Sequence, residues 1–567
     1  MSTLRARSLV IGLDGADLSV IRELGPRRLP VLHSLMDRGV VAAMDTVQPP
    51  ATLPNWTTFL TTLDPGEHGV FDFTTRDGYS VRFTAGSVRE APTFAARLDT
   101  LGKRCACLFF PATYPPERLR HGIFISGWDA PVAFSGDASF VWPPALHGEL
   151  LQRFGPQRFD DVDEFAADED HWHARLADAL IGRIEHRVEL ALHLLQREPF
   201  DLFAIYFGES DTASHHLWSL WDTGSPRHPL GTGEFLREGL PRVYAALDRA
   251  VGTLLEAAGG DAVELTLVSD HGSGGSSDKV LYLNHALQRA GLLQMKPAAR
   301  GRAFSRLKDL ALTALPPALR ERVFRLAGTR LPSWLESQVR FGQIDMARTR
   351  VFSDELNYFP ALHVNLRGRE PRGVVDPADL HALREEIERA LLALRDPWSG
   401  RPVVRALHAR QDLYRGPHLD RAPDFALELE LDDGYSYNLM PSASAPEAGM
   451  VFRRLAPGEY LGRKGRSLPG SHRRHGLYLA AGPRVTRRGE IEAHIADASA
   501  TVLARMDVAL PAGAPGAVLP LGQTLGTDGV ALPESSPAAR DAKDAAAGAA
   551  HDEARVAARL RNLGYIE

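Results

Sequence analysis

Residues 49–56 read PPATLPNW, and they place a hydroxyl residue, Thr52, directly ahead of a predicted amphipathic helix. Pro54 suits the first turn of that helix, because the N–H that proline lacks has no partner there. Thr52 should therefore lie among the unpaired amides of a helix N-terminus, where a phosphate or an alkoxide is favoured. A threonine hydroxyl is a poor nucleophile at neutral pH, so a base or a metal ion must activate it. Thr52 is thus our candidate nucleophile, and the rest of the chain must supply its activation.

The size and composition of the chain predict a large folded protein. Its 567 residues are too many for one simple core, so we expect a large domain with an insertion or a second lobe. Hydrophobic residues make up 44% and charged residues 24%, as in folded soluble proteins. The net charge of -6 argues against binding to a nucleic-acid polymer by bulk charge. Cys105 and Cys107 alternate along a predicted strand, and we interpret them as small apolar residues.

The N-terminus carries two arginines within residues 1–10, but Asp14 interrupts the apolar run behind them. This run is too short for the core of a signal peptide or for a transmembrane segment. We therefore expect a cytoplasmic protein of a bacterial-type cell. The sequence predicts nothing about its oligomeric state.

Residues typical of metal sites follow buried strands at three places. Three apolar runs predict strands covered on both faces of a parallel sheet: 8–13, 200–207 and 263–268. The residues of interest directly after them are Asp14, then Asp211 with His215, then Asp270 with His271. In open α/β sheets, ligands bind beyond the carboxyl ends of the strands. An Asp-Gly pair such as Asp14-Gly15 also commonly forms a turn. Asp270 and His271, in contrast, are hard to explain as packing residues.

The remaining pattern predicts helices, further strands and an insertion. If a helix starts after Asp211, His215 lies on the same helix face as Asp211, and His216 points about 100° away from His215. We therefore interpret only His215 as a ligand. A glycine-serine loop should follow Gly272. We also expect helices over 172–196, 376–394 and 495–506, and strands over 104–110, 359–366, 425–431 and 477–481.

The predicted domains follow from changes in composition. Residues 291–350 are rich in arginine and predict a helical cap insertion, whose basic face is either solvated or a surface for an anionic substrate or membrane headgroups. Residues 1–290 and 351–525 should form the catalytic core. Residues 526–552 predict a disordered linker, and 553–567 a C-terminal helix.

Five motifs together resemble the alkaline phosphatase superfamily, in its type I phosphodiesterase/nucleotide pyrophosphatase branch and among the related bacterial phosphohydrolase/phosphomutase-like proteins. The motifs occur in the order of that family and cover nearly the whole chain: Leu13-Asp14-Gly15, Thr52-Leu53-Pro54-Asn55, Asp211 with His215, Ser269-Asp270-His271-Gly272 and Gly470-Ser471-His472. The resemblance implies an alkaline-phosphatase-like α/β fold, with a large and mostly parallel central sheet between helices and the helical cap as an insertion.

The resemblance also implies two divalent metal ions and a set of ligands. One ion would be bound by Asp211, His215 and His472, and the other by Asp14, Asp270, His271 and Thr52. Mixed carboxylate and imidazole ligands suit zinc, and manganese or iron also accepts them. The implied reaction is in-line phosphoryl transfer from a small-molecule phosphate ester to Thr52, followed by release to water. The sequence departs from the family at Thr62, where relatives usually have glycine in the turn after the nucleophile helix.

Three other functions compete with a phosphoric ester hydrolase. A sulfatase of this superfamily needs a Cys/Ser-x-Pro-x-Arg motif, which Thr52 and the missing arginine exclude. A phosphomutase or phospho-alcohol transferase would use the same metal site and pass the group to another hydroxyl. A metal-stapled interaction protein without activity would use the basic cap and the disordered tail as binding surfaces.

The residues after Thr52 predict the class of ester. A phosphomonoester is a dianion, which a guanidinium binds best, and residues 52–56 contain no arginine. Asn55 can donate a neutral hydrogen bond to a phosphate oxygen, which suits a diester. We therefore expect a phosphodiesterase with Asn55 in a catalytic role, unless Arg473, Arg474 or an arginine of the cap supplies the missing charge.

Overall fold

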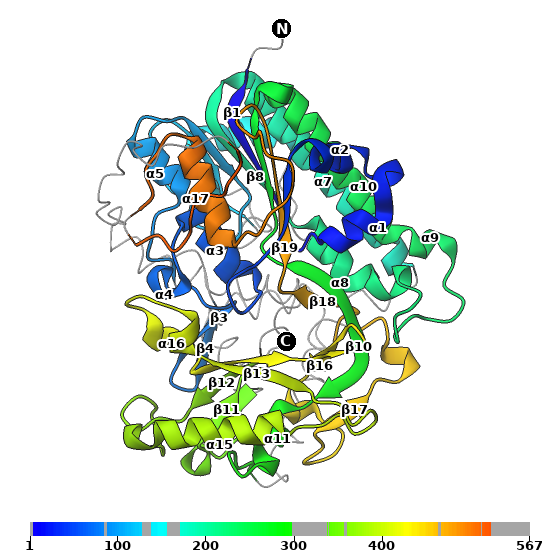
Figure 1. Ribbon diagram of the computed structural model, residues 1–567, viewed down its shortest axis with the longest axis vertical. Coiled ribbons are helices and arrows are strands. Elements are labelled where there is room, and N and C mark those ends of the chain that lie inside the picture. Colours follow the sequence, from blue (N-terminus) through cyan, green and yellow to red (C-terminus); the bar gives the residue numbers. More distant parts are fainter. Residues whose placement is uncertain are drawn as a thin grey trace.

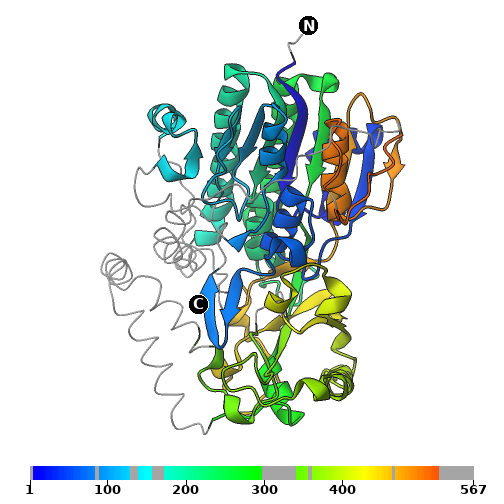
Figure 2. The same ribbon diagram turned by 90° about the vertical axis from the view of Figure 1, so that its left-hand side faces the viewer.

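The computed structural model describes residues 4–83, 88–127, 138–155, 171–296, 337, 340–355, 360–462, 467–511 and 513–522. These residues form two lobes (Figure 1). The core lobe surrounds a large sheet, and the second lobe, made of the described residues of 276–462, contains smaller sheets. Figure 2 shows the same two lobes after a quarter turn. Within the described residues, no helix is long and apolar enough to cross a membrane.

The described part of the core lobe is built on a sheet of nine strands, most of them parallel. Their order is β20 (Gly489–Glu490), β2 (Val40–Met44), β19 (Gly476–Ala481), β9 (Glu264–Val268), β1 (Ala6–Leu13), β8 (Phe200–Phe207), β5 (Cys105–Leu108), β6 (Ile123–Ile125) and β7 (Val141–Trp142). The central strands from β9 to β6 run parallel to their neighbours. Their nearly continuous burial explains the apolar runs of the sequence, and the predicted α/β fold is confirmed.

Helices cover both faces of this sheet (Figure 1). One face carries α1 (Leu18–Arg28), α2 (Pro30–Arg38), α7 (Trp172–Arg197), α8 (Glu209–Trp221) and α10 (Gly239–Ala258). The other carries α3 (Thr52–Thr61), α5 (Phe94–Thr100) and α17 (Ile495–Arg505). Three further helices of the described core lobe are α6 (Pro144–Phe154) and the short α4 (Pro65–His68) and α9 (Glu234–Arg237). The apolar faces of α7 and α10 pack together, as the helical period of the sequence predicts.

The second lobe has its own hydrophobic cluster. A sheet in the order β11 (Val351–Ser353), β12 (Ala361–Val364), β14 (Phe425–Leu429) and β13 (Val404–Ala409) packs with α15 (Leu380–Leu392) and α11 (Leu283–Arg289). The short helix α16 (Arg410–Leu413) directly follows β13. Beside this sheet lies a second one, in the order β15 (Leu431–Asp432), β16 (Tyr435–Leu439), β10 (Gly272–Leu281) and β17 (Phe452–Arg454). The first half of β10 also pairs with β18 (Gly470–Arg473).

The glycine-serine loop predicted after Gly272 is wrong, because these residues begin strand β10. A Cβ at Gly274 would lie 2.4 Å from the guanidinium of Arg473, and one at Gly275 would lie 2.6 Å from the ring of Tyr435. The small residues are therefore required by close packing on a strand, although their composition is typical of a loop.

The second lobe leaves and re-enters the core through adjacent strands. The chain departs after β9 and returns at β19, and these two strands pair antiparallel. A Cβ at Gly272 would lie 2.2 Å from the carbonyl oxygen of His475, and one at Gly476 would lie 2.5 Å from that of Ser269. The two crossing points therefore touch. A hairpin of β3 (Thr74–Asp77) and β4 (Ser80–Phe83) lies next to the second lobe (Figure 1). It gives a further contact between the lobes, because Arg76 pairs with Glu370 at 2.8 Å.

Several predicted boundaries shift or lie outside the described residues. The predicted helix over 376–394 begins as a short 3-10 turn and becomes α15 only at Leu380. Strand β2 is absent from the sequence interpretation. Most of the predicted cap at 291–350 lies outside the described residues, although Met295 and Ile344 form an isolated β-bridge at its base. The predicted linker at 526–552 and helix at 553–567 also lie outside them, so the division into domains stays a prediction.

Candidate metal centre

Thr52 is the first residue of α3 and is only 1% exposed. The preceding Ala51 occupies the N-cap position, and no side chain caps the helix there. The Thr52 Oγ1 atom lies 3.4 Å from Nε2 of His271. The hydroxyl is thus buried at the N-terminus of a ten-residue helix, whose dipole favours negative charge at that end.

Asn55 has a placement that the sequence did not indicate. Its Nδ2 donates to the carbonyl oxygen of Ala51 at 2.9 Å, and to those of Val47 and Pro49 at 3.3 Å. Its Oδ1 accepts from the backbone N–H of Val47 at 2.9 Å. The amide therefore holds the loop that leads to Thr52. This geometry gives no support to a direct bond from Asn55 to the substrate, and that role stays a prediction.

Two carboxylates lie at the carboxyl ends of β1 and β9, and each is held by one oxygen. Asp14 Oδ2 accepts from the hydroxyl of Tyr206 at 2.6 Å and from Nε1 of Trp56 at 3.0 Å. Asp270 Oδ1 accepts from the backbone N–H of Gly15 at 3.1 Å. Among the described residues, the other oxygens, Asp14 Oδ1 and Asp270 Oδ2, are buried without a hydrogen-bond donor. Each carboxylate is therefore oriented from behind and presents one open oxygen.

Those open oxygens face the ring of His271. Its Nε2 lies 3.2 Å from Asp270 Oδ2 and 3.5 Å from Asp14 Oδ1. Its Nδ1 lies 3.0 Å from the carbonyl oxygen of Gly272, to which it can only donate. A neutral imidazole that donates from Nδ1 carries its lone pair on Nε2. Three lone-pair atoms therefore converge on one buried point.

The rings of His215 and His472 repeat this arrangement. Their Nδ1 atoms lie 3.1 Å and 2.8 Å from the carbonyl oxygens of Gly470 and Pro50, respectively. Their Nε2 atoms lie only 3.0 Å apart. Two neutral rings that both donate from Nδ1 would bring two lone pairs together, which is unfavourable unless a cation lies near them. A backbone acceptor on the far nitrogen is the usual support of a metal-binding histidine.

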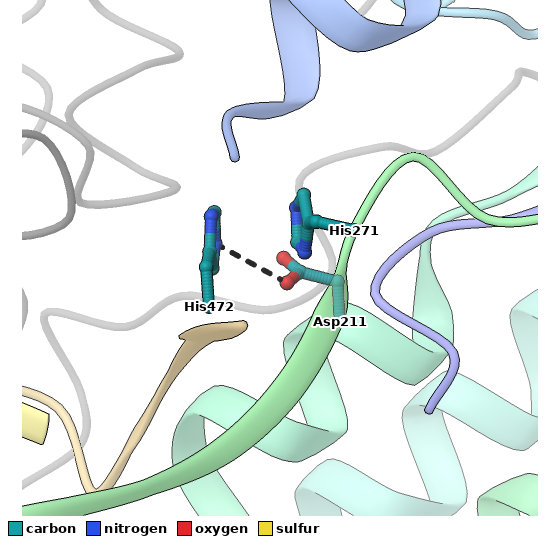
Figure 3. Close-up of side chains that lie close together, drawn as sticks. All are labelled: Asp211, His271 and His472. Atoms are coloured by element: carbon teal, nitrogen blue, oxygen red, sulfur yellow. Dashed lines mark ion pairs between the residues drawn. The ribbon is translucent and has the colours of Figure 1, made fainter. Parts of the chain in front are cut away.

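Asp211 completes the cluster from the first turn of α8. Its Oδ1 lies 3.3 Å from Nε2 of His215 and 3.6 Å from Nε2 of His472. Figure 3 shows its carboxylate beside the rings of both His271 and His472. Those two rings stack, with centroids 3.7 Å apart. Burial alone would raise the pKa of Asp211, but the adjacent His215 outweighs that effect and lowers it.

Burial shifts the pKa values of the other members as well. Burial, together with a neighbouring carboxylate, raises the pKa of Asp14 and of Asp270 well above the ordinary value. Burial lowers the pKa of His271 to about 4 and that of His472 well below its ordinary value. The centre thus holds crowded carboxyl groups together with two imidazoles, those of His271 and His472, whose burial favours the neutral form, and a cation would relieve this combination.

The donor set fits divalent metal ions. Two groups each bring three possible ligand atoms within 4.8 Å of one another: Asp211, His271 and His472, and Asp14, Asp270 and His271. The structure therefore brings the six residues predicted as ligands together with Thr52. His271 belongs to both groups, which the separate sets of the sequence interpretation did not indicate. His216 lies outside, with its ring against Trp172 at 5.1 Å.

Other residues of the predicted motifs have structural placements. His475 is exposed, whereas His472 is buried. His68 is buried and lies 3.0 Å from Thr58 Oγ1, away from the metal cluster. Thr62 ends α3 in the left-handed region with φ 62°, where the glycine of relatives would fit without strain. Its buried Oγ1 has no hydrogen-bond partner among the described residues.

The sequence interpretation missed the residues that hold the ligands. Tyr206 and Trp56 lie in an apolar strand and an apolar helix face, so their hydrogen bonds to Asp14 leave no signal in the pattern. Both are buried among aromatic rings, with centroids 5.4 Å apart.

Known proteins resemble this chain in sequence family and in fold. A family model described as type I phosphodiesterase/nucleotide pyrophosphatase matches residues 8–450. No curated protein matches the chain. Among solved structures, phosphonoacetate hydrolase from Sinorhizobium meliloti 1021 in complex with phosphonoformate has a TM-score of 0.51 and 14% identity, covering 89% of this chain and 96% of that one. An inactive variant of murine ectonucleotide pyrophosphatase/phosphodiesterase 5 in complex with AMP has a TM-score of 0.46, with the same identity and coverage.

Proposed function

Because this chain belongs to the type I phosphodiesterase/nucleotide pyrophosphatase family, we propose that it is a two-metal phosphoric ester hydrolase that acts through a phospho-threonine at Thr52. The observation that carries the proposal is the convergence of buried ligand-type atoms near Thr52, whose Oγ1 lies 3.4 Å from Nε2 of His271. Asp14 Oδ1 and Asp270 Oδ2 lie close to that Nε2 atom, and the Nε2 atoms of His215 and His472 lie 3.0 Å from each other.

Metal ions bound by these residues would lower the pKa of the threonine hydroxyl and stabilise the charge that develops on the phosphate oxygens. Thr52 Oγ1 then attacks phosphorus and loses its proton, the bond to the alcohol breaks, and the departing alcohol takes up a proton. Water attacks the same phosphorus from the other side and restores the threonine hydroxyl. The N-terminus of α3 adds favourable backbone dipoles for the phosphate.

The placement of two arginines supports a diester substrate. Arg473 donates to the carbonyl oxygens of Gly275 at 2.8 Å and Gly434 at 3.0 Å, and also to Ser436. Arg474 forms two bonds of 2.7 Å with Asp45. Both guanidinium groups are therefore engaged elsewhere, so neither supplies the cation that the second charge of a monoester would need. A diester carries one charge less, so it needs no such cation.

The test is a panel of aryl phosphate monoesters and diesters with leaving groups of equal pKa, nucleotide-type diesters and an aryl sulfate, each with added zinc or manganese. We expect the highest kcat/KM for a diester and no turnover of the sulfate. A clear preference for monoesters would reject the diesterase assignment and keep the threonine mechanism. Transfer of the phosphoryl group to an added alcohol in preference to water would indicate the mutase or transferase, and a metal-loaded protein inert toward every ester would indicate the interaction protein.

A further inference from the structure

Arg227 is a fully buried arginine outside the metal centre, in the segment between α8 and α9. Its guanidinium has five N–H groups, and they meet five oxygen atoms. The acceptors are the carbonyl oxygens of Tyr460 at 2.8 Å, Leu468 at 2.7 Å, Glu459 at 3.3 Å and Ser467 at 3.4 Å, and the amide oxygen of Asn438 at 3.4 Å. One side chain thus fixes the backbone at four points, two at 459–460 and two at 467–468.

The two segments that Arg227 joins both carry predicted metal ligands. Its own segment follows α8, which contains Asp211 and His215. The segment that it holds leads directly into β18, which contains His472. The last acceptor, Leu468, is four residues before that histidine. Arg227 therefore connects the segment that follows α8 to the residues just before β18.

The packing around Arg227 leaves little freedom for this connection. A Cβ at Gly462 would lie 1.9 Å from the carbonyl oxygen of Ser467 and 3.2 Å from Nη2 of Arg227, so the two parts of the segment close against the guanidinium. A Cβ at Gly470 would lie 2.0 Å from the carbonyl oxygen of Ser214 on α8. The carbonyl of Gly470 also accepts from Nδ1 of His215. A shift of 467–470 would therefore change the support of His215 as well as the position of His472.

We propose that Arg227 is a positioning residue for the half of the metal centre formed by Asp211, His215 and His472. It sets the distance between α8 and β18, and thereby the separation of the two facing imidazoles. This inference rests on the proposed metal centre. A buried cation costs free energy unless its donors are satisfied, so the five contacts define one position for the segment that carries them.

The test is a titration of the metal-stripped protein with zinc alone, followed by calorimetry. The wild-type chain should bind two equivalents. Arg227→Gln should keep one equivalent at wild-type affinity and weaken the other by about 10–100-fold, the usual effect of removing support behind a ligand. Arg227→Lys should restore part of that affinity. If the glutamine variant fails to fold, the zinc titration of Arg227→Lys serves as the test instead.

A matched control is Arg505→Gln. Arg505 is equally buried and donates to the carbonyl oxygens of Leu265 and Ala481, near the amino end of β9 and away from the ligands. This variant should lose stability in thermal unfolding yet bind both zinc ions as the wild type does. Equal weakening of both sites in Arg227→Gln, unchanged binding, or the same selective loss in Arg505→Gln would overturn the inference. A wild-type chain that binds no zinc would refute the proposed function, and the inference with it.

Discussion

The two halves of the metal centre differ in what holds them. Asp14, Asp270 and His271 follow neighbouring parallel strands whose pairing runs unbroken from Ser8 to Gly12, so the central sheet itself sets their spacing. His472 lies on β18, which pairs with β10 between the lobes, and its support comes from the carbonyl of Pro50. One half is therefore defined by the central sheet, whereas the other combines two ligands on the core helix α8 with one on a strand between the lobes.

The two halves have similar carboxylate and imidazole ligands, but different parts of the fold hold those ligands in place. In the sheet half, Asp14 is backed by two side-chain donors of the core, Tyr206 and Trp56. In the second half, His215 and His472 are backed by the carbonyl groups of Gly470 and Pro50, and Arg227 fixes the residues just before Gly470. Changes to loops and lobe contacts should therefore affect the second half selectively. The Thr52 hydroxyl lies 3.4 Å from Nε2 of His271, a residue that belongs to both groups of possible ligands.

The largest effect is expected for Thr52→Ala. Turnover should fall by more than about a hundredfold, the scale of losing a nucleophile, while zinc binding stays nearly intact because the hydroxyl is one ligand among several. Steady-state kinetics and metal analysis of the same preparation measure both quantities. Thr57→Ala is the control, since Thr57 is buried on the same helix and its hydroxyl donates to the carbonyl oxygen of Leu53. Near wild-type turnover in Thr52→Ala would exclude the covalent mechanism.

His472→Ala should remove one metal equivalent and leave the sheet half occupied. His475→Ala, three residues away and exposed, should keep both equivalents. Metal analysis after dialysis at low free zinc measures the difference. The reverse result, with a metal lost from the His475 variant alone, would move the ligand and break the division into two halves.

Asn55→Ala separates two roles of one side chain. We expect a loss of about 10–1,000-fold in kcat/KM, the range for a transition-state hydrogen bond. If Asn55 acts through the loop of 47–51, zinc affinity should fall as well, because the carbonyl of Pro50 in that loop supports His472. A fall in kcat with unchanged zinc affinity would instead indicate direct contact with the substrate.

Tyr206→Phe should have the smallest effect on zinc affinity, and this effect should be confined to the sheet half. Removing the hydroxyl takes one of two donors from Asp14 Oδ2, so zinc affinity there should fall by about tenfold. Tyr478→Phe is the matched control, since the Tyr478 hydroxyl is buried without a hydrogen-bond partner among the described residues. Loss of the other zinc ion in Tyr206→Phe would show that the halves are not independent.

The sequence predicts the sheet half better than the second half, for physical reasons. Asp14 and Asp270 come directly after apolar runs, and strand burial leaves a clear pattern with a polar residue at its end. The assignment of His472 came from the resemblance alone, because β18 is short and its neighbour β10 has the composition of a loop. Arg227 leaves no signal, since its acceptors are backbone carbonyls that any residue could supply.

The touching exits of the second lobe have a consequence for protein engineering. A linker of very few residues would suffice to join His271 to Gly476 and delete everything between them, because the chain leaves and returns through paired strands. Such a deletion would discard His472 with the lobe and leave half of a metal centre. A chimera with a foreign second lobe must therefore keep β18 of this chain. The two junctions should lie inside the lobe, away from β10 and from the segment that precedes β18.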